Sequence, residues 1–390
     1  MGFLDGVKVV DFTHAYAGPF CSLFLADYGA EVIKIERVDG GDQARTWGPF
    51  KNDYSAYYAS FNRGKKSITL DIKSKEGQKI IYDLIKDADI VCSNFKAGTL
   101  EKYGVGYEQM KQVKPDIIYA TISGFGTKGE LSKYPAYDNV IQAMSGIMDV
   151  NGFADKGPTK IGPAIGDSYT GLLLLLGLII AFHHRQKTGK GQQIDVTMLG
   201  ALFGLLEYPV LEYANNGKVI SRSGNASHYV APSDVYQTKD DYIAITVKDD
   251  SQWKTFCSIL GLPDTEEYAT NAQRLDNQAE LKILIEEKLK DYTSKEAEAL
   301  FDGSSIAVYS VMGIAESLEN PQLLARDMVI EVEDPVMGPV KLVGNPIHLS
   351  ENKPVTNIPS PTLGEHTDAI LQQLGYTEEK ISALKEAKVI

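Results

Sequence analysis

The chain is poor in cysteine and in the short motifs that mark metal, phosphate and hydrolase sites. Its 390 residues include three cysteines, Cys21, Cys92 and Cys257, which lie far apart in apolar or strand-like surroundings. They form no CxxC pair and have no metal-ligand spacing to a histidine, so we expect reduced core thiols and no metal. The sequence also lacks GxxxxGK[ST], GxSxG and HExxH motifs, which disfavours a P-loop, a serine-hydrolase elbow and a zinc peptidase.

Signals for secretion and for membrane insertion are also missing. The N-terminus lacks a basic start followed by an apolar region, and the apolar run 172–182 is interrupted by Gly177 and is too short to span a bilayer. A net charge of −13 disfavours nucleic acid as a partner, although a local basic pocket can still hold a phosphorylated ligand. We expect a soluble, cytoplasmic protein with no membrane and no nucleic-acid partner.

The first half of the chain alternates strand patterns with helix patterns. Helical stretches separate six predicted strands, at residues 7–12, 31–35, 67–70, 90–92, 117–122 and 193–196. This alternation is typical of an α/β fold with a doubly wound parallel sheet. At 390 residues the chain is long enough for two domains.

The character of the sequence changes after Leu202. An apolar helix, an Asn-Asn-Gly turn and a polar loop follow, so residues 203–220 are predicted to link two domains. Residues 1–202 then form a large Rossmann-like domain, and residues 221–320 form a smaller α+β domain. Proline-rich extended segments and a final helix pair occupy residues 321–390.

Polar, aromatic and glycine residues follow the predicted strands. Ligands of open parallel sheets bind outside the carboxyl ends of the strands, so these loops are the expected site. Their mixture suits an extended ligand that carries phosphates and a flat ring. Basic residues near the strand ends could neutralise the phosphates, with ordinary surface charge as the alternative. They are Lys34, Arg37, Arg45, Arg63, Lys65, Lys66, Lys96 and Lys102.

One glycine motif fails as a dinucleotide signal. Residues 124–129 read Gly-Phe-Gly-Thr-Lys-Gly after a strand, but residues 130–135 have the pattern of an irregular loop. A dinucleotide site needs a helix that opens on this motif. We therefore expect neither a nicotinamide nor a flavin cofactor.

Asp167 stands at the start of a long apolar helix, in a chain with few other nucleophile motifs. The run 172–182 behind it has the pattern of a buried helix, which places Asp167 in the first turn or at the N-cap. Unpaired amides and the helix dipole favour an anion there, and a carboxylate held ionised can be a nucleophile. The alternative is that Asp167 merely caps the helix.

Segments spread along the chain resemble the family III (CaiB/BaiF-type) coenzyme A transferases, which include formyl-CoA:oxalate and carnitine CoA-transferases. The segments are Ala17-Gly18-Pro19, residues 25–36 and 62–71, Asn94-Phe95, Gly166-Asp167 and residues 363–368. The similarity extends from about Val7 to the last helix. The order and spacing of the segments carry the resemblance.

The resemblance implies a mechanism and a set of site residues. Asp167 would attack an acyl-CoA thioester, pass through a mixed anhydride and an aspartyl-CoA thioester, and deliver CoA to a carboxylic acid. CoA or acyl-CoA is then a substrate. The residues at family CoA positions are His14, Ala17, Arg37, Lys65, Asn94, Phe95, Lys102 and Tyr137. Those that would face the acyl or acceptor group are Tyr16, Trp47 and Tyr57.

The same resemblance implies how domains and chains assemble. The segment 321–390 would complete the large domain that residues 1–202 begin, with the stretch 334–361 as the return path. Two chains would interlock as a homodimer.

Two departures from the family and two alternative functions bear on the reaction. The loop 224–227 is shorter than the glycine-rich loop of the oxalate enzymes, and Tyr16 replaces a polar amide, which disfavours an oxalate acceptor. A 2-methylacyl-CoA racemase of the same fold would carry a histidine–aspartate pair where this chain has Tyr137-Asp138. Tyrosine, with an ordinary pKa of about 10, is a poor base at neutral pH. A CoA-binding protein without turnover would not need Asp167.

Overall fold

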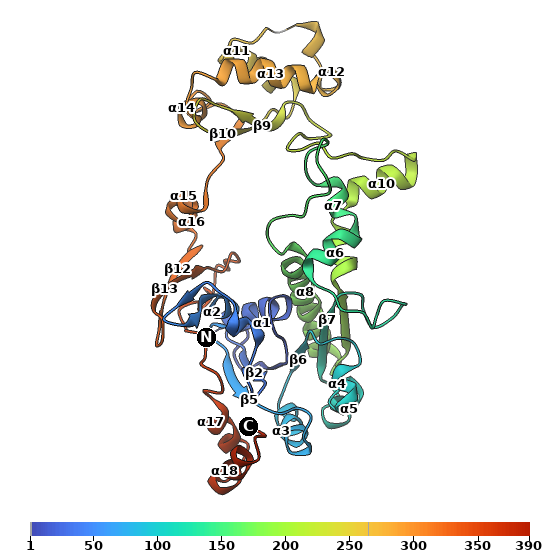
Figure 1. Cartoon of the computed structure of the whole chain (residues 1–390), viewed down its shortest axis with the longest axis vertical. Coiled ribbons are helices and arrows are strands. Elements are labelled where there is room, and N and C mark those ends of the chain that lie inside the picture. Colours follow the sequence, from blue (N-terminus) through green and yellow to red (C-terminus); the bar gives the residue numbers. More distant parts are fainter. Residues whose placement is uncertain (1, 264) are drawn as a thin grey trace. The chain divides into compact units, whose positions relative to one another are not determined.

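The structure, a computed structural model, describes residues 2–263 and 265–390 and divides into two compact units. The first unit comprises residues up to 147 together with 161–207 and 321–390, and the second comprises 148–160 and 208–320. Residues 148–160, which we predicted to lie in the large domain, belong to the second unit. The N- and C-terminal segments lie together in the first unit (Figure 1).

A six-stranded parallel sheet forms the centre of the first unit (Figure 1). Its strands are β1 (Lys8–Asp11), β2 (Glu31–Glu36), β5 (Lys66–Thr69), β6 (Ile90–Ser93), β7 (Ile118–Ser123) and β8 (Gln193–Thr197). The order β5-β2-β1-β6-β7-β8 is that of dinucleotide-binding sheets. The order reverses between β1 and β6, and a ligand crevice is expected beyond the carboxyl ends of these strands.

Helices bury apolar stripes against the sheet. Five of them share one buried cluster with the strands, namely α3 (Lys75–Ile85), α4 (Thr99–Lys102), α5 (Tyr107–Val113), α17 (Thr367–Gln373) and α18 (Glu378–Glu386). In α3 the N-cap Ser74 accepts the amide hydrogen of Gly77 at 3.0 Å. The apolar residues of its buried stripe are Ile80, Ile81, Leu84 and Ile85.

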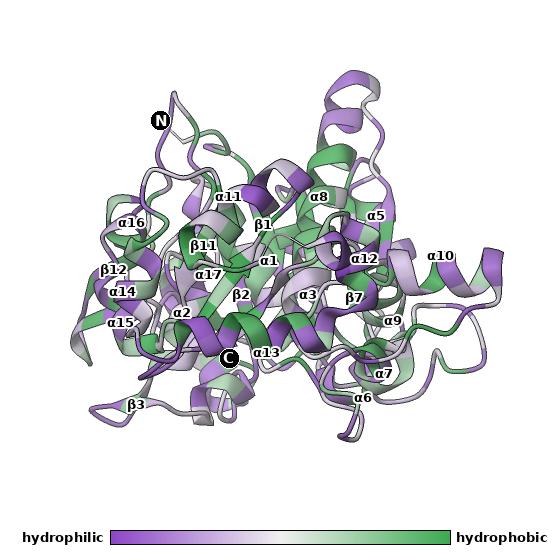
Figure 2. Ribbon diagram, turned by 90° about the horizontal axis from the view of Figure 1, so that it is seen from above, coloured by the Kyte–Doolittle hydropathy of each residue, from purple (hydrophilic) through white to green (hydrophobic). Residues whose placement is uncertain are grey.

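The helix that carries Asp167 is α8 (Ile165–Thr188), which packs on α1 (Ala17–Asp27), β7 and β8. At 24 residues it is, within the described part of the chain, the one helix long and apolar enough to cross a membrane. The helix is therefore longer than the apolar run 172–182, which we expected to be too short to span a bilayer. Its buried stripe is Gly166, Thr170, Gly171, Leu174, Leu178 and Ala181, a spacing typical of a helix that packs along one face. Leu172, Leu176, Ile179 and Ile180 remain exposed. The hydropathy colouring of Figure 2 shows the hydrophobic character of α8.

Shorter elements complete the first unit. They are η1 (Gln43–Thr46), β3 (Phe50–Lys51), β4 (Tyr54–Ser55), α2 (Ala56–Asn62), α4 (Thr99–Lys102), α6 (Asp138–Ser145), α9 (Met198–Gly204), α16 (Pro321–Ala325), β12 (Val329–Asp334) and β13 (Gly338–Val343). Two more, α7 (Ile147–Val150) and α10 (Glu207–Asn216), cross the boundary between the units. The predicted linker helix is thus broken into α9 and α10, and the antiparallel hairpin of β12 and β13 was not predicted.

The second unit is a small antiparallel sheet with helices. Its sheet has the order β11-β10-β9, from β9 (Ser233–Gln237), β10 (Tyr242–Thr246) and β11 (Ala307–Ser310). Its helices are α11 (Asp250–Leu260), η2 (Glu266–Tyr268), α12 (Asn271–Asp276), α13 (Gln278–Leu289), α14 (Ser294–Ala299) and α15 (Ile314–Glu319). Trp253 and Phe256 lie in its buried core.

Candidate active site

Asp167 lies in the first turn of α8 but does not cap that helix. The N-cap is Ala164, which offers no side-chain hydrogen bond. The acceptor comes from Asp138 on α6, whose Oδ1 accepts the amide hydrogen of Gly166 at 2.7 Å. Oδ2 of Asp138 accepts a hydrogen bond from Nε2 of Gln142, also at 2.7 Å. The capping role is therefore filled by Asp138.

Asp167 instead faces the start of α1. Its carboxylate accepts a hydrogen bond from the backbone amide of Ala17, the first residue of α1. Gly171, one turn further along α8, permits this approach, because a Cβ there would lie 2.6 Å from the carbonyl oxygen of Ala17. A glycine is therefore required where the two helices cross.

The electrostatics of Asp167 differ from our expectation of a carboxylate held ionised by the helix dipole. Burial and the negative charge of Asp138 raise the pKa of Asp167 to about 7. The hydrogen bond from Ala17 lowers this pKa and offsets only part of the shift. At neutral pH both protonation states are populated, and the ionised form is available to attack a carbonyl carbon.

An aromatic wall stands beside Asp167. The ring centres of Tyr16 and Tyr57 are 6.3 Å apart, and those of Trp47 and Tyr57 are 5.5 Å apart, so the three predicted residues lie together. The ring centre of Phe61, which we did not predict, lies 4.4 Å from the ring centre of Tyr16. Its spacing of four residues from Tyr57 on α2 is the signal that would have found it. Burial raises the pKa of both tyrosines, and the charge of Asp167 adds to the shift, so their hydroxyls stay protonated.

A cavity of about 260 Å³ opens beyond the carboxyl ends of β1 and β2. This is where an open parallel sheet is expected to bind a ligand. Three predicted CoA residues line it, and they supply an imidazole, an exposed guanidinium and a phenyl ring. The lining residues are Phe12, Thr13, His14, Lys34, Ile35, Glu36, Arg37, Gly41, Asp42, Gln43 and Phe95.

Asn94 positions His14 at this cavity. Oδ1 of Asn94 accepts the amide hydrogen of His14 at 2.9 Å, and its Nδ2 donates to the carbonyl oxygen of His14 at 2.7 Å. The rings of His14 and Phe95 are 4.9 Å apart. Burial lowers the pKa of His14, which favours a neutral imidazole at pH 7. Asn94 therefore acts on the loop backbone.

Lys65 cannot hold a phosphate, so this prediction was wrong. Its side chain is fully buried, and its Nζ lies 3.2 Å from Oδ2 of Asp11, 2.8 Å from Oγ of Ser22 and 3.0 Å from Oδ1 of Asn62. Burial lowers the pKa of Lys65 to about 8. Lys65 directly precedes β5, and its side chain points toward Pro19 and Ser22 of α1. The positions of charged residues in the sequence do not reveal this direction.

Two other predicted CoA residues lie outside the cavity. Lys102, at the end of α4, is exposed to solvent. Tyr137, which precedes α6, is 71% exposed. Both side chains are accessible, but the structure does not bring them to the cavity.

The sheet has the strand order of a dinucleotide-binding fold, but the acid that would bind a ribose hydroxyl is engaged by another residue. Glu36 ends β2, where such folds place the acid that binds a ribose hydroxyl. Its two carboxylate oxygens instead receive hydrogen bonds from Nη2 and Nε of Arg45, at 2.7 and 2.8 Å. Within residues 2–263 and 265–390, no group of three or more His, Cys, Asp or Glu side chains is arranged to hold a metal ion.

Known proteins resemble this chain over nearly its whole length. Residues 4–367 match CoA-transferase family III. A succinyl-CoA:mesaconate CoA-transferase from Haloarcula hispanica is 35% identical over 389 residues, which cover 96% of this chain and 97% of the relative. An acetyl-CoA:oxalate CoA-transferase from Acetobacter aceti is 35% identical over 384 residues, with 97% of each chain covered. A crystal structure of a CaiB/BaiF family protein from Brucella suis has a TM-score of 0.87 and 36% identity, over 96% of this chain and 99% of that one. The parallel-sheet fold, the site loops and these relatives agree that the chain is an enzyme of CoA-transferase family III.

Proposed function

We propose that Asp167 is the nucleophile in a transfer of CoA from an acyl-CoA donor to a carboxylic acid. The observation that carries the proposal is the division of roles at α8, where Asp138 binds the Gly166 amide and Asp167 faces Ala17. An ionised oxygen of Asp167 attacks the thioester carbonyl carbon, the carbon–sulfur bond breaks, and CoA leaves as a thiolate. A mixed anhydride remains on Asp167.

The next two steps take place at the side-chain carboxyl carbon of Asp167. The CoA thiolate attacks the side-chain carbonyl of Asp167 and releases the donor acid, which leaves an aspartyl-CoA thioester. The acceptor carboxylate then attacks this carbon and expels the thiolate, and a second anhydride forms. Attack of the thiolate on the acceptor carbonyl gives the new acyl-CoA and frees Asp167. The Ala17 amide supports these steps by donating a hydrogen bond to the Asp167 oxygen as negative charge develops there.

The cavity beyond β1 and β2 suits the nucleotide end of CoA. Arg37 is exposed and lines this cavity, and its Nε donates to the carbonyl oxygen of Gly41 at 3.1 Å. Its outer guanidinium nitrogens are then available to bind a phosphate. The rings of His14 and Phe95 offer surfaces for the adenine. The proposal uses no metal, nicotinamide or flavin.

The acceptor is proposed to be a small carboxylic acid larger than oxalate. The relatives named above for mesaconate and oxalate act on dicarboxylic acids. In this chain the rings of Tyr16, Trp47, Tyr57 and Phe61 give the site an apolar wall, which favours an acid with a hydrocarbon part.

Racemisation fits this geometry less well. A racemase needs a free acid and base next to the carbon beside the thioester. Both oxygens of Asp138 are engaged, with Gly166 and Gln142. Tyr137 is largely exposed to solvent.

A cytoplasmic homodimer is also proposed. The exposed apolar side of α8 forms a contact surface that a second copy would cover; its residues are Leu172, Leu176, Ile179 and Ile180. The interlocking of two chains predicts that the dimer does not dissociate on dilution. Sedimentation that detects a reversible monomer at micromolar concentration would contradict it. The buried free cysteines suit a reducing compartment.

Turnover of Asp167 variants tests the proposed reaction. Acetyl-CoA, succinyl-CoA and butyryl-CoA are each incubated with a panel of small carboxylic acids, and acyl-CoA products are followed by mass. Wild-type protein should transfer CoA to at least one acid, and Asp167→Ala and Asp167→Asn should not. Asp167→Ala is needed because asparagine can deamidate to aspartate. Near-normal turnover by both variants would contradict the proposal.

A further inference from the structure

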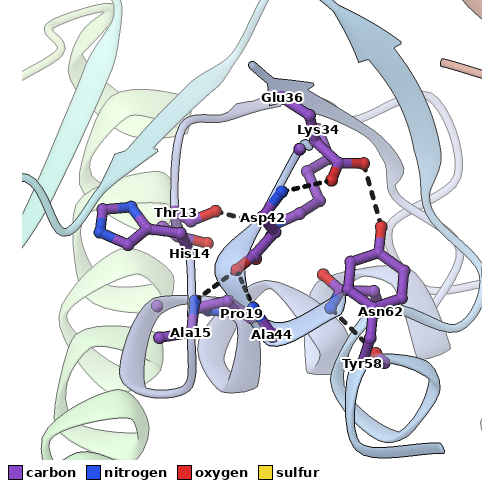
Figure 3. A network of polar contacts seen from close by, with 12 residues as sticks. Thr13, His14, Ala15, Pro19, Lys34, Glu36, Asp42, Ala44, Tyr58 and Asn62 are labelled. Atoms are coloured by element: carbon purple, nitrogen blue, oxygen red, sulfur yellow. Dashed lines mark hydrogen bonds and ion pairs between the residues drawn. The ribbon is translucent and has the colours of Figure 1, made fainter. Parts of the chain in front are cut away.

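The loop between β1 and α1 is held at three consecutive residues. Figure 3 shows the contacts of two of them, Thr13 and Ala15. The carbonyl oxygen of Thr13 accepts a hydrogen bond from Nζ of Lys34 at 2.6 Å. The backbone of His14 is bound on both sides by Asn94. The amide of Ala15 donates to Oδ1 of Asp42 at 3.0 Å.

This loop ends at the groups that meet Asp167. Tyr16 and Ala17 follow directly, and they supply the first ring of the aromatic wall and the amide that binds the Asp167 carboxylate. A displacement of Ala15 therefore moves the amide that orients the nucleophile.

Ala15 adopts a conformation that its surroundings must maintain. Its φ of 66° lies in the left-handed region, which is unfavourable for a residue with a Cβ. Such strain persists only where neighbouring contacts hold the residue, and it concentrates at functional sites.

The contact that holds Ala15 comes from a buried ion pair. Nζ of Lys34 lies 2.8 Å from Oδ2 of Asp42, and the two side chains are 0% and 1% exposed. Oδ1 of Asp42 also accepts the amide hydrogen of Ala44 at 2.9 Å. Burial of two charges carries a large desolvation penalty, so the pair is weak evidence for a role in stability alone.

We propose that Lys34 and Asp42 are positioning residues, which hold Ala15 in its left-handed conformation so that the Ala17 amide meets Asp167. They act through the loop backbone. This inference rests on the proposed role of Asp167 as nucleophile.

A second buried ion pair, at the far end of α1, provides a matched control. Asp27 ends α1 and lies 2.7 Å from Arg63, and both side chains are 2% exposed. It stands about 15 Å along the helix axis from Ala17. Loss of Asp27 therefore removes a comparable buried pair without touching the loop.

The first arm of the test compares kinetics and stability. Asp42→Ala should lower kcat about tenfold to a hundredfold, the range for misplacement of a reacting group, with a much smaller change in KM for acyl-CoA. Asp27→Ala should lower the melting temperature as much or more and leave kcat within about twofold. Equal losses of kcat in both variants would overturn the inference, because they would indicate a general loss of stability.

The second arm asks for rescue. Glycine takes a positive φ without a Cβ clash, so Ala15→Gly added to Asp42→Ala should recover several-fold of the lost kcat. Asp42→Asn keeps an acceptor oxygen for Ala15 and should lose less kcat than Asp42→Ala, so it serves where the alanine variant does not fold. No recovery by Ala15→Gly in either background would overturn the positioning role.

A third readout does not depend on the chemistry. Amide hydrogen exchange over residues 13–20 should be faster in Asp42→Ala than in wild type and unchanged in Asp27→Ala. Unchanged exchange in Asp42→Ala would overturn the positioning role while Asp167 stays the nucleophile. Turnover by Asp167→Asn and Asp167→Ala would instead refute the proposed reaction, and the exchange result would still report on the loop.

Discussion

Gly166 donates its amide hydrogen to Oδ1 of Asp138 at 2.7 Å, and this bond leaves the carboxylate of Asp167 free to meet the amide of Ala17. Two acids thus lie at the start of α8. Asp138 accepts a hydrogen bond from a backbone amide of the first turn, and Asp167 faces the substrate side. The arrangement also places a second negative charge close to Asp167.

Activity should rise with pH through neutrality. The pKa of Asp167 is raised to about 7, so its ionised fraction grows as pH passes from about 6 to 8 and kcat/KM should rise to a plateau. Asp138→Asn removes a negative charge, which lowers the pKa of Asp167 and moves the rise to lower pH. The variant should also lose about 1 kcal/mol of stability, because its amide nitrogen cannot accept from Gln142. Superimposable pH profiles of kcat/KM would contradict this account.

Stability should show the opposite trend with pH. The folded state holds the Asp167 proton up to about pH 7, whereas an unfolded aspartate releases it near pH 3.8. Between these values the folded state binds more protons, so this group lowers the free energy of unfolding as pH rises. Asp167→Asn lacks the effect and should gain stability relative to wild type between pH 5 and pH 8. Thermal unfolding at both pH values checks this, and a constant difference between the two proteins would refute it.

Gly171 should be intolerant of a methyl group. A Cβ at this position would lie 2.6 Å from the Ala17 carbonyl oxygen, which is backbone and cannot move aside. Gly171→Ala should therefore destabilise the protein by about 1–3 kcal/mol and lower kcat. Gly177→Ala, in the same helix, would place its Cβ 3.2 Å from Cγ2 of Ile194, a side-chain methyl, and should stay within about 1 kcal/mol of wild type. Equal effects of the two changes on urea unfolding and kcat would argue against a tight α1–α8 contact.

Substitutions of Arg37 and Lys65 should have different effects, although Arg37 directly follows β2 and Lys65 directly precedes β5 of the same sheet. Arg37→Ala should weaken CoA binding by about 1–3 kcal/mol, the range for a hydrogen bond to a charged group, without a loss of stability. Lys65→Met leaves the buried Asp11 without its ion-pair partner and should cost about 3–5 kcal/mol of stability. Calorimetric titration with CoA and urea unfolding separate the two. Normal CoA affinity in Arg37→Ala would remove Arg37 from the site.

Local pattern was enough to predict the sheet, because each strand is a short apolar run bounded by turns. All six predicted strands of the parallel sheet are present, each within one residue of its predicted ends. The hairpin of β12 and β13 was missed. Its strands do alternate buried and exposed residues, but Pro335 and Pro339 gave the segment the character of an unpaired extended stretch.

Local pattern predicted site residues only where they lie next to the end of their own strand, whereas the grouping of Tyr16, Trp47 and Tyr57 was predicted from the family resemblance. His14, Arg37 and Phe95 follow three different strands and meet at one cavity. The direction of the Lys65 side chain and the bond between Asp138 and Gly166 depend on packing between segments far apart in the chain. No local pattern specifies such contacts.

The most direct measurement of the central claim is the location of the covalent intermediate. Protein is incubated with an acyl-CoA donor without acceptor, treated with hydroxylamine and digested, and the peptides are read by mass. Wild type should carry a hydroxamate on the peptide that contains Asp167, at that residue, and Asp167→Asn should carry none. A hydroxamate at another residue, or its equal formation in Asp167→Asn, would contradict the mechanism.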